Sequence, residues 1–394
     1  MPTYTVPLTT PVPAALAGEL ASRLYHADER ITGFTLPDEG TDVAEVVITT
    51  DLPVAAAELN RRVGDLVRSD VLPQRVVTPR LLWRSPHRPA RRPHVYRDLL
   101  DSGAVHESAP GQVTVAEPLL GLMRDLDQAL LDLARDRFGA EEHDYPQLIP
   151  TATLARAGYL GSFPQHVLLT SRVHAHLDGY RAFTRAIGRG TPSSGVVDAH
   201  TTHAGLAVPP AVCYHTYARH SDRAMTAPLT VVTARARCFR HESRYCHSLE
   251  RLWDFTMRET VLLGEQDRVL AAREAYLTAL RAVVTDWGLA GHIESANDPF
   301  FATPDTARQV WSQRLMELKY ELRLPVAEGR TVAAASVNVH GTHLAKAFGI
   351  TTASGYPGFT GCVAVGLERL AYAFVHQHGA DPRNWPRVRR PGNT

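Results

Sequence analysis

The segment from Leu229 to Gly264 constrains the fold most, because both of its halves alternate with a period of two residues around a polar loop. Such alternation predicts two antiparallel strands. It places Cys238 and Arg240 on one face of the first strand, behind two small residues, Ala234 and Ala236. The returning strand puts four further side chains on one face: Trp253, Phe255, Met257 and Glu259.

This pair of strands can be interpreted in two ways. An arginine, an aromatic ring and a carboxylate above a floor of small residues could bind a nucleotide. Arg240 would then hold a phosphate, Phe255 would stack on the base, and Glu259 would bind a metal ion or an amine. The alternative is a half-buried hairpin with surface charges, and the pattern alone leaves both open.

A second informative segment runs from Gly361 to Gly379, where an apolar strand leads into a helix that starts near Gly366. Arg369 falls in the first turn of this helix, where the helix dipole favours anions rather than cations. The dipole together with an arginine would make a phosphate site. Arg369 could equally be an ordinary surface arginine.

Composition limits the function classes. With 394 residues, 44% of them hydrophobic and 21% charged, the chain is typical of globular proteins and long enough for two or three domains. Lys+Arg 42 against Asp+Glu 41 gives no whole-protein reason to expect a nucleic-acid or membrane partner. No apolar run spans a bilayer, no signal peptide is evident, and the four cysteines form no CxxC pair. We therefore expect a cytoplasmic protein. Only two lysines occur, Lys319 and Lys346.

The chain is predicted to have three parts. Residues 1–74 follow the order β-α-β-β-α-β, which predicts a small ferredoxin-like domain of unknown role. This domain is acidic, because residues 1–70 contain eleven Asp and Glu but only five Arg. Residues 75–97 contain seven arginines and several prolines, and they form either a linker or a docking strip for an acidic partner. Residues 98–394 form the third domain, with a helix over 117–139 and another predicted over 168–188.

Three ordered motifs resemble the signatures of class II aminoacyl-tRNA synthetases. The first is the 117–139 helix followed by FGAEEHDYPQLIP, with Pro146 at the proline that lies near the dimer axis in that class. The second is FRHE followed by FTMRE, and the third is GCVAVGLERL. The resemblance covers about Glu117 to the C-terminus. It implies an α+β fold with an antiparallel sheet flanked by helices, and a homodimer.

Within this class the chain is most similar to the seryl branch, and above all to its truncated homologues, the amino acid:carrier protein ligases. The resemblance rests on these segments: GYLGSFPQH, PPAVCYHTY, CFRHES, DPFF, LKYELRLP and ASVNVHGTH. It implies a zinc ion held by Cys213, Glu259 and Cys362. Three protein ligands leave a fourth position open, which suits a free α-amino group. Cys238 and Cys246 are alternative ligands, and Cys238 is expected to pack under the substrate.

The resemblance also assigns roles around ATP. Arg240 would contact the α-phosphate, Glu242 the adenine side and Arg369 the γ-phosphate, while Phe255 would stack on the ring. Glu321 would bind Mg²⁺, although Val332 stands where ordinary seryl enzymes carry a metal-binding glutamate. Ser336 and Asn338 would contact the amino acid. The nearby His340 and His343 are expected to be structural.

These roles imply ATP-dependent activation of a small amino acid, glycine, alanine or serine, as an aminoacyl-adenylate. The acyl group would pass to the phosphopantetheine thiol of an acidic carrier protein. tRNA is the less favoured acceptor, because the sequence shows no long heptad pattern and residues 1–74 are acidic and lie outside the resemblance. Transfer to a small amine and a catalytically inactive regulator remain alternatives.

Overall fold

The computed structural model describes residues 1–37, 40–74, 79–89, 92, 94–188, 190–191, 193–242, 246, 248–296 and 318–388. Its centre is an eight-stranded sheet with the order β4-β13-β14-β15-β16-β12-β11-β7, antiparallel except for the β11–β7 pair. The strands are β4 (Leu81–Arg84), β7 (Glu141–His143), β11 (Leu229–Phe239), β12 (Asp254–Gly264), β13 (His292–Ser295), β14 (Lys319–Ala327), β15 (Arg330–Gly341) and β16 (Phe359–Gly366).

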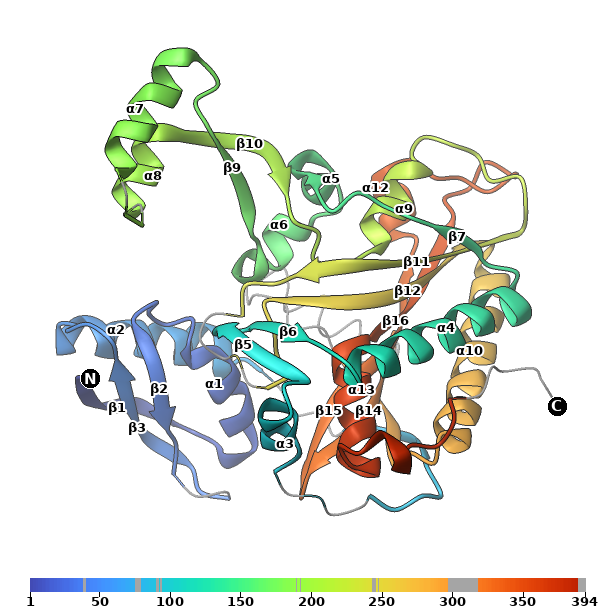
Figure 1. Cartoon of the computed structure of the whole chain (residues 1–394), viewed down its shortest axis with the longest axis horizontal. Helices are drawn as coiled ribbons and strands as arrows, with labels where there is room; N and C mark the ends of the chain where they lie inside the picture. Colours follow the sequence, from blue (N-terminus) through green and yellow to red (C-terminus); the bar gives the residue numbers. More distant parts are fainter. Residues whose placement is uncertain are drawn as a thin grey trace.

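Three long helices cover one face of this sheet (Figure 1): α4 (Leu119–Phe138), α10 (Gln266–Asp286) and α13 (Leu367–His378). Their apolar side chains and those of the strands beneath them form the largest core. Helix α4 ends at Gly139, whose φ of 63° is left-handed and favours glycine. The helix α3 (Val95–Asp101) and the hairpin of β5 (Val105–Ala109) and β6 (Gln112–Val115) lie beside this layer.

Shorter helices lie on the opposite face: α5 (Thr151–Arg156), α6 (Tyr159–Ser162), α9 (Cys213–Arg219) and α12 (His343–Phe348). The 3-10 turn Pro164–His166 contacts α6. The 3-10 turn Pro382–Asn384 follows α13, and the next residue, Trp385, packs against the main core. A second core forms where α9 and α12 pack on β12 and β16. Because these helices cover only part of the sheet, the strands can line a cavity on this side.

An arm projects from this face (Figure 1). It consists of β9 (Leu169–Val173), α7 (Leu177–Ile187), α8 (Ser194–His200) and β10 (Thr201–Ala207), and β10 also pairs with β8 (Ile149–Pro150). The single helix predicted over 168–188 is therefore wrong in its first third, where β9 pairs with β10. Three large apolar side chains on the arm are exposed: Leu169, Leu177 and Tyr180.

The N-terminal residues form a unit with its own core. Its elements are β1 (Thr3–Val12), the 3-10 turn Ala14–Leu16, α1 (Ala17–Leu24), β2 (Ile31–Thr35), β3 (Val43–Thr50), α2 (Ala56–Leu66) and the π-turn Val67–Val71. The three strands are antiparallel in the order β1-β3-β2, which agrees with the first three strands of a ferredoxin-like unit. The expected fourth strand covers residues 74–79, most of which lie outside the described ranges, so the ferredoxin-like assignment stays a prediction.

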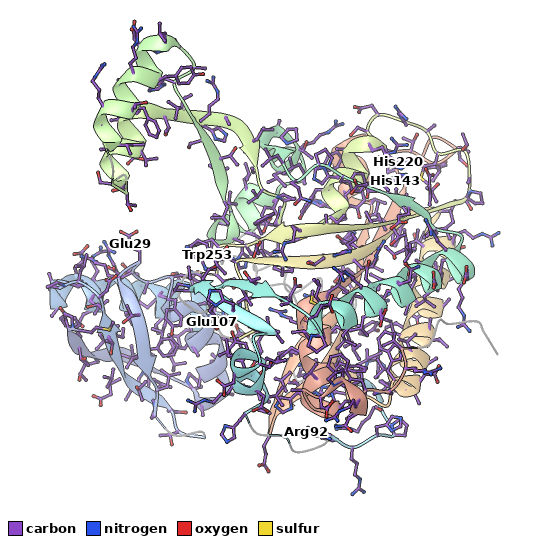
Figure 2. All side chains as sticks on the ribbon, in the orientation of Figure 1. Glu29, Arg92, Glu107, His143, His220 and Trp253 are labelled. Carbon is purple, nitrogen blue, oxygen red and sulfur yellow. The ribbon has the colours of Figure 1, made fainter. Side chains whose placement is uncertain are left out.

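Part of the Arg/Pro-rich segment 75–97 belongs to the large sheet. Strand β4 within it pairs with β13 at one edge of the large sheet, and the Arg80 backbone N–H donates to Ser295 Oγ at 2.8 Å. Trp253, just before β12, donates its backbone N–H to Gly111 in the β5–β6 hairpin at 3.0 Å, and Figure 2 shows Glu107 on the same hairpin. Within the described ranges, no helix has the length and apolar character needed to cross a membrane.

Candidate active site

The cavity has a volume of about 540 Å³ and its floor is the central part of the sheet. Directly paired residues of adjacent strands share a face, so the register sets up rows of side chains. One row runs across β14, β15 and β16 through Lys319, Asn338 and Cys362. The next row lies two residues along and extends to β12: Glu321, Ser336, Ala364 and Glu259. Small residues in these rows leave the space above them open.

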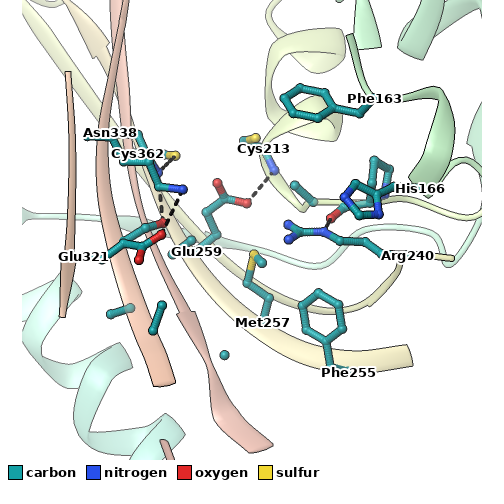
Figure 3. A pocket seen from close by; sticks show the side chains of 18 of the residues that line it. Phe163, His166, Cys213, Arg240, Phe255, Met257, Glu259, Glu321, Asn338 and Cys362 are labelled. Atoms are coloured by element: carbon teal, nitrogen blue, oxygen red, sulfur yellow. Dashed lines mark hydrogen bonds and ion pairs between the residues drawn. The ribbon is translucent and has the colours of Figure 1, made fainter. Parts of the chain in front are cut away.

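Cys213, Glu259 and Cys362 meet at one corner of the cavity, as Figure 3 shows. Helix α9 begins at Cys213, and Glu259 Oε2 accepts the backbone N–H groups of Val212 and Cys213, both at 2.9 Å. Two buried donors at the start of the helix therefore fix the carboxylate of a side chain that is 2% exposed.

The two thiols at this corner interact with each other. The hydrogen bond with Cys362, followed by burial, raises the pKa of Cys213. For Cys362 the same hydrogen bond lowers the pKa, but burial and Glu259 outweigh it and the pKa is raised overall. Across the described residues, no group of three or more His, Cys, Asp or Glu side chains has an arrangement that could hold a metal ion as it stands. The corner therefore brings suitable donors together without a preformed metal cage.

Asn338 connects this corner to the rest of the floor. Its Nδ2 donates to Cys362 Sγ at 3.4 Å and to Ser336 Oγ at 3.0 Å. Its Oδ1 is buried and has no hydrogen-bond partner among the described residues. Gly361 allows β15 and β16 to approach here, because a Cβ at this position would lie 2.8 Å from the Asn338 carbonyl oxygen. The cavity thus presents an unused acceptor beside two thiols and a carboxylate.

The other end of the cavity carries arginines. Arg240 follows β11, its guanidinium lies 5.3 Å from the ring centroid of Phe255, and its Nε donates to the Pro210 carbonyl at 3.1 Å (Figure 3). Arg369, in the first turn of α13, donates to the backbone carbonyls of Glu250 and Ala333. Burial, followed by Arg251 and Arg240, lowers the pKa of Arg369 to about 10. Two guanidinium groups, those of Arg240 and Arg369, thus line this end of the cavity.

Glu242 lies next to these arginines and is 9% exposed. Burial raises its pKa, but Arg251, whose Nη1 lies 2.6 Å from Glu242 Oε2, and His166 outweigh burial, so the pKa is lowered overall. Burial lowers the pKa of His166 to about 4. A carboxylate and a neutral imidazole therefore accompany the arginines at the mouth of the cavity.

Glu321 also lines the cavity, but its two oxygens are engaged. Oε1 lies 3.1 Å from Lys319 Nζ, and Oε2 accepts from Arg323 Nη1 at 3.0 Å. Lys319 was not among the sequence-based site residues. The signal was present, because the spacing K-x-E-x-R on one strand places the three charges on one face.

Glu368 is a second residue that sequence reasoning missed. It is 2% exposed at the start of α13, where the helix dipole favours an acid, and it accepts the backbone N–H and hydroxyl of Thr256. Burial raises its pKa. These bonds tie β12, just after Phe255, to the turn that carries Arg369.

The remaining candidate residues take structural positions. Cys238 is fully buried in a cluster with Met257 and Phe255, and both Cys238 and Cys246 lie outside the cavity lining. His340 contacts Cys362 Sγ at 3.7 Å and the Tyr217 hydroxyl at 3.3 Å. The DPFF motif, Asp298–Phe301, lies outside the described residues.

Solved structures identify the class of this fold. The seryl-tRNA synthetase of M. kandleri, solved with tRNASec of A. aeolicus, matches 91% of this chain and 72% of its own, with a TM-score of 0.71 and 24% identity. The cytoplasmic serine–tRNA ligase of Naegleria fowleri, solved with AMP, matches 84% of this chain over 77% of its own length, with a TM-score of 0.58 and 12% identity. The fold is that of the class II aminoacyl-tRNA synthetases, which confirms the α+β prediction.

Curated relatives identify the family, although no family model matches the chain. Amino acid–(acyl-carrier-protein) ligase 1 of Bradyrhizobium diazoefficiens is 35% identical over 253 residues, which are 63% of this chain and 74% of the relative. Ligase 2 of the same organism is 37% identical over 248 residues, which are 61% of this chain and 71% of the relative. The type-2 serine–tRNA ligase of Methanococcus aeolicus is 26% identical over 289 residues, which are 71% of this chain and 55% of the relative. The chain belongs to the amino acid–(acyl-carrier-protein) ligase family.

Proposed function

We propose that this protein activates a small amino acid, glycine, alanine or serine, with ATP, and transfers it as a thioester to the phosphopantetheine arm of a carrier protein. The observation that carries the proposal is the membership of this family together with one cavity that has arginines at one end and an acceptor-rich corner at the other. The two ends match the two parts of an aminoacyl-adenylate.

ATP occupies the arginine end in this proposal. Arg240 contacts the α-phosphate and stabilises the charge that develops as pyrophosphate leaves, and Arg369 holds the γ-phosphate. The adenine ring stacks on Phe255, against which Arg240 already packs, and Glu242 lies on the adenine side. Burial, followed by the neighbouring Arg251, lowers the pKa of Arg369, and a polyphosphate bound beside this guanidinium would stabilise its charge.

The amine of the substrate occupies the other corner. We propose that Cys213, Glu259 and Cys362 hold a zinc ion whose open position takes the α-amino group, a role that excludes species with a blocked amine. The donor set fits zinc, and the hydrogen bond between the two thiols supports their convergence on one ion. Ser336 and Asn338 line the rest of the amino-acid pocket. Binding of the ion would rearrange these side chains from their present positions.

Magnesium is expected to accompany ATP. Glu321, the candidate ligand, would have to share its oxygens between Mg²⁺ and the two cations that they already contact, Lys319 and Arg323. Val332 is buried and offers no oxygen in its side chain. We therefore propose that most of the ligands of Mg²⁺ are phosphate oxygens and water, as is usual for this ion.

The acceptor and the assembly follow from the same proposal. The exposed arginines of the segment 75–97 would guide an acidic carrier protein, and the first motif, α4 with β7, would form a homodimer interface. Glu141, Pro146 and Leu148 in this motif are exposed in the single chain, which supports an interface there. We further propose a cytoplasmic location.

The test is amino-acid-dependent exchange between ATP and pyrophosphate across the twenty amino acids, followed by transfer assays with holo-carrier protein, tRNA and small amines. We expect exchange with one or more of glycine, alanine and serine, and labelling of the holo-carrier but not of the apo-carrier. Absence of exchange with every amino acid would refute activation, and labelling of tRNA alone would refute the carrier protein as acceptor. Metal analysis of the same sample tests for zinc.

A further inference from the structure

Lys319 and Glu321 form a buried ion pair in the wall of the cavity. The side chains are 10% and 15% exposed, and both line the cavity. The pair is held from outside the cavity, because Arg323 bonds Glu321 and also lies 3.3 Å from Glu294 Oε1 on β13. The ammonium group of Lys319 is therefore fixed in position rather than mobile at a surface.

Stability does not account for this arrangement. A buried ion pair adds little net stability compared with apolar residues of similar volume, because removing both charges from water is costly. A long lysine side chain also loses rotamer entropy when it is held in place. In a chain with only two lysines, a lysine in this position requires another explanation.

The register places Lys319 at the end of the row that starts at Cys362. Adjacent strands lie about 4.8 Å apart, so the backbones of β14 and β16 are about 10 Å apart at this row, with Asn338 between them. The Cys362 end takes the amine of the substrate, and the arginine end takes the carboxyl group during adenylation. With the amine and the carboxyl group placed in this way, the side chain on the α-carbon points along the row, toward Lys319.

We infer that the Lys319–Glu321 pair forms the wall that the amino-acid side chain faces, and that the volume of Lys319 determines how large this side chain can be. This inference rests on the proposed function and adds to it the residue that sets substrate size. The apolar stem of the lysine contacts the small side chain, and the ammonium group stays with Glu321. Shortening the residue opens the row to larger side chains.

The test measures kcat/KM in pyrophosphate exchange for glycine, alanine, 2-aminobutyrate and norvaline. Lys319→Ala should raise the ratio of 2-aminobutyrate or norvaline to alanine by about 10-fold or more, the usual effect of one methylene in a fitted pocket. Lys319→Met keeps the length without the charge and should leave the ratio within about 3-fold of the wild type. Lys346→Ala is the matched control, because Lys346 is the other lysine, exposed on α12 and outside the cavity lining.

The outcomes separate this inference from the proposed function. Wild-type protein that exchanges pyrophosphate with no amino acid contradicts the proposed function. An active wild type with an unchanged ratio in Lys319→Ala, or with all substrates reduced equally, contradicts the inference. An equal gain for Lys319→Met and Lys319→Ala also contradicts it, because charge rather than volume would then be decisive. Melting temperatures of the variants confirm that they are folded.

Discussion

Replacing Glu259 by glutamine separates the structural role of this side chain from its proposed role as a metal ligand. The carboxylate accepts two backbone N–H groups at 2.9 Å, and glutamine can still accept both through its carbonyl oxygen. Hydrogen bonds to charged groups are worth about 1 kcal/mol more than neutral ones, so Glu259→Gln should cost about 2 kcal/mol of folding free energy. Glu259→Ala leaves two buried donors unsatisfied and should cost roughly 2–6 kcal/mol.

The assay compares three quantities for the wild type and both variants: melting temperature, zinc per chain and pyrophosphate exchange. We expect the melting temperature to fall modestly in Glu259→Gln and further in Glu259→Ala. Zinc and exchange should be lost in both, because a neutral amide is a poor replacement for the carboxylate ligand. A Glu259→Gln variant that keeps one zinc per chain and wild-type exchange would refute the ligand assignment. A Glu259→Ala variant as stable as Glu259→Gln would refute the hydrogen-bond argument.

Three further predictions concern other parts of the molecule. Arg240→Ala should lower kcat for exchange by about 100-fold or more without loss of zinc, because it removes a positioned donor to the developing charge; equal loss of zinc would contradict this role. Hydrogen bonding from Arg30, aided by Arg62, lowers the pKa of Asp28 to about 2, so its contribution to stability is complete above about pH 4 and is lost as the pH falls toward 2. Thermal melts from pH 7 to pH 2 should show this loss in the wild type and not in Asp28→Asn. Three arginines of the segment 75–97 are exposed: Arg84, Arg88 and Arg97. Replacing all three by serine should lower kcat/KM for the carrier protein at low salt but not at high salt, and pyrophosphate exchange should stay unchanged. If the variant transfers to the carrier protein as fast as the wild type at low salt, the docking role is wrong.

The parts of the site that depend on local pattern were predictable. Period-two alternation identified β11 and β12 and the shared face of Phe255, Met257 and Glu259, which line the cavity. Trp253, expected on the same face, lies before β12 and outside the cavity lining. The first strands of the N-terminal unit follow the predicted order for the same reason. The K-x-E spacing on β14 likewise places Lys319 and Glu321 on one face.

The parts that depend on contacts between distant segments were not predictable. Which residue of β15 lies opposite Cys362 is set by strand register and bulges, as between Val339 and Gly341, and no local pattern states it. In residues 168–188, β9 forms because β10, some thirty residues later, pairs with it. Strand β4 could not be recognised from the sequence, because its partner β13 lies about two hundred residues away.

The alternation of the cavity floor has a consequence for how this protein can change over evolutionary time. Two floor residues each adjoin a valine that faces the helices: Asn338 adjoins Val337, and Cys362 adjoins Val363. A deletion or insertion of one codon inside β15 or β16 would turn these valines toward the cavity. These strands can therefore vary by replacement but not in length, whereas the arm between β9 and β10 is free to lengthen or shorten.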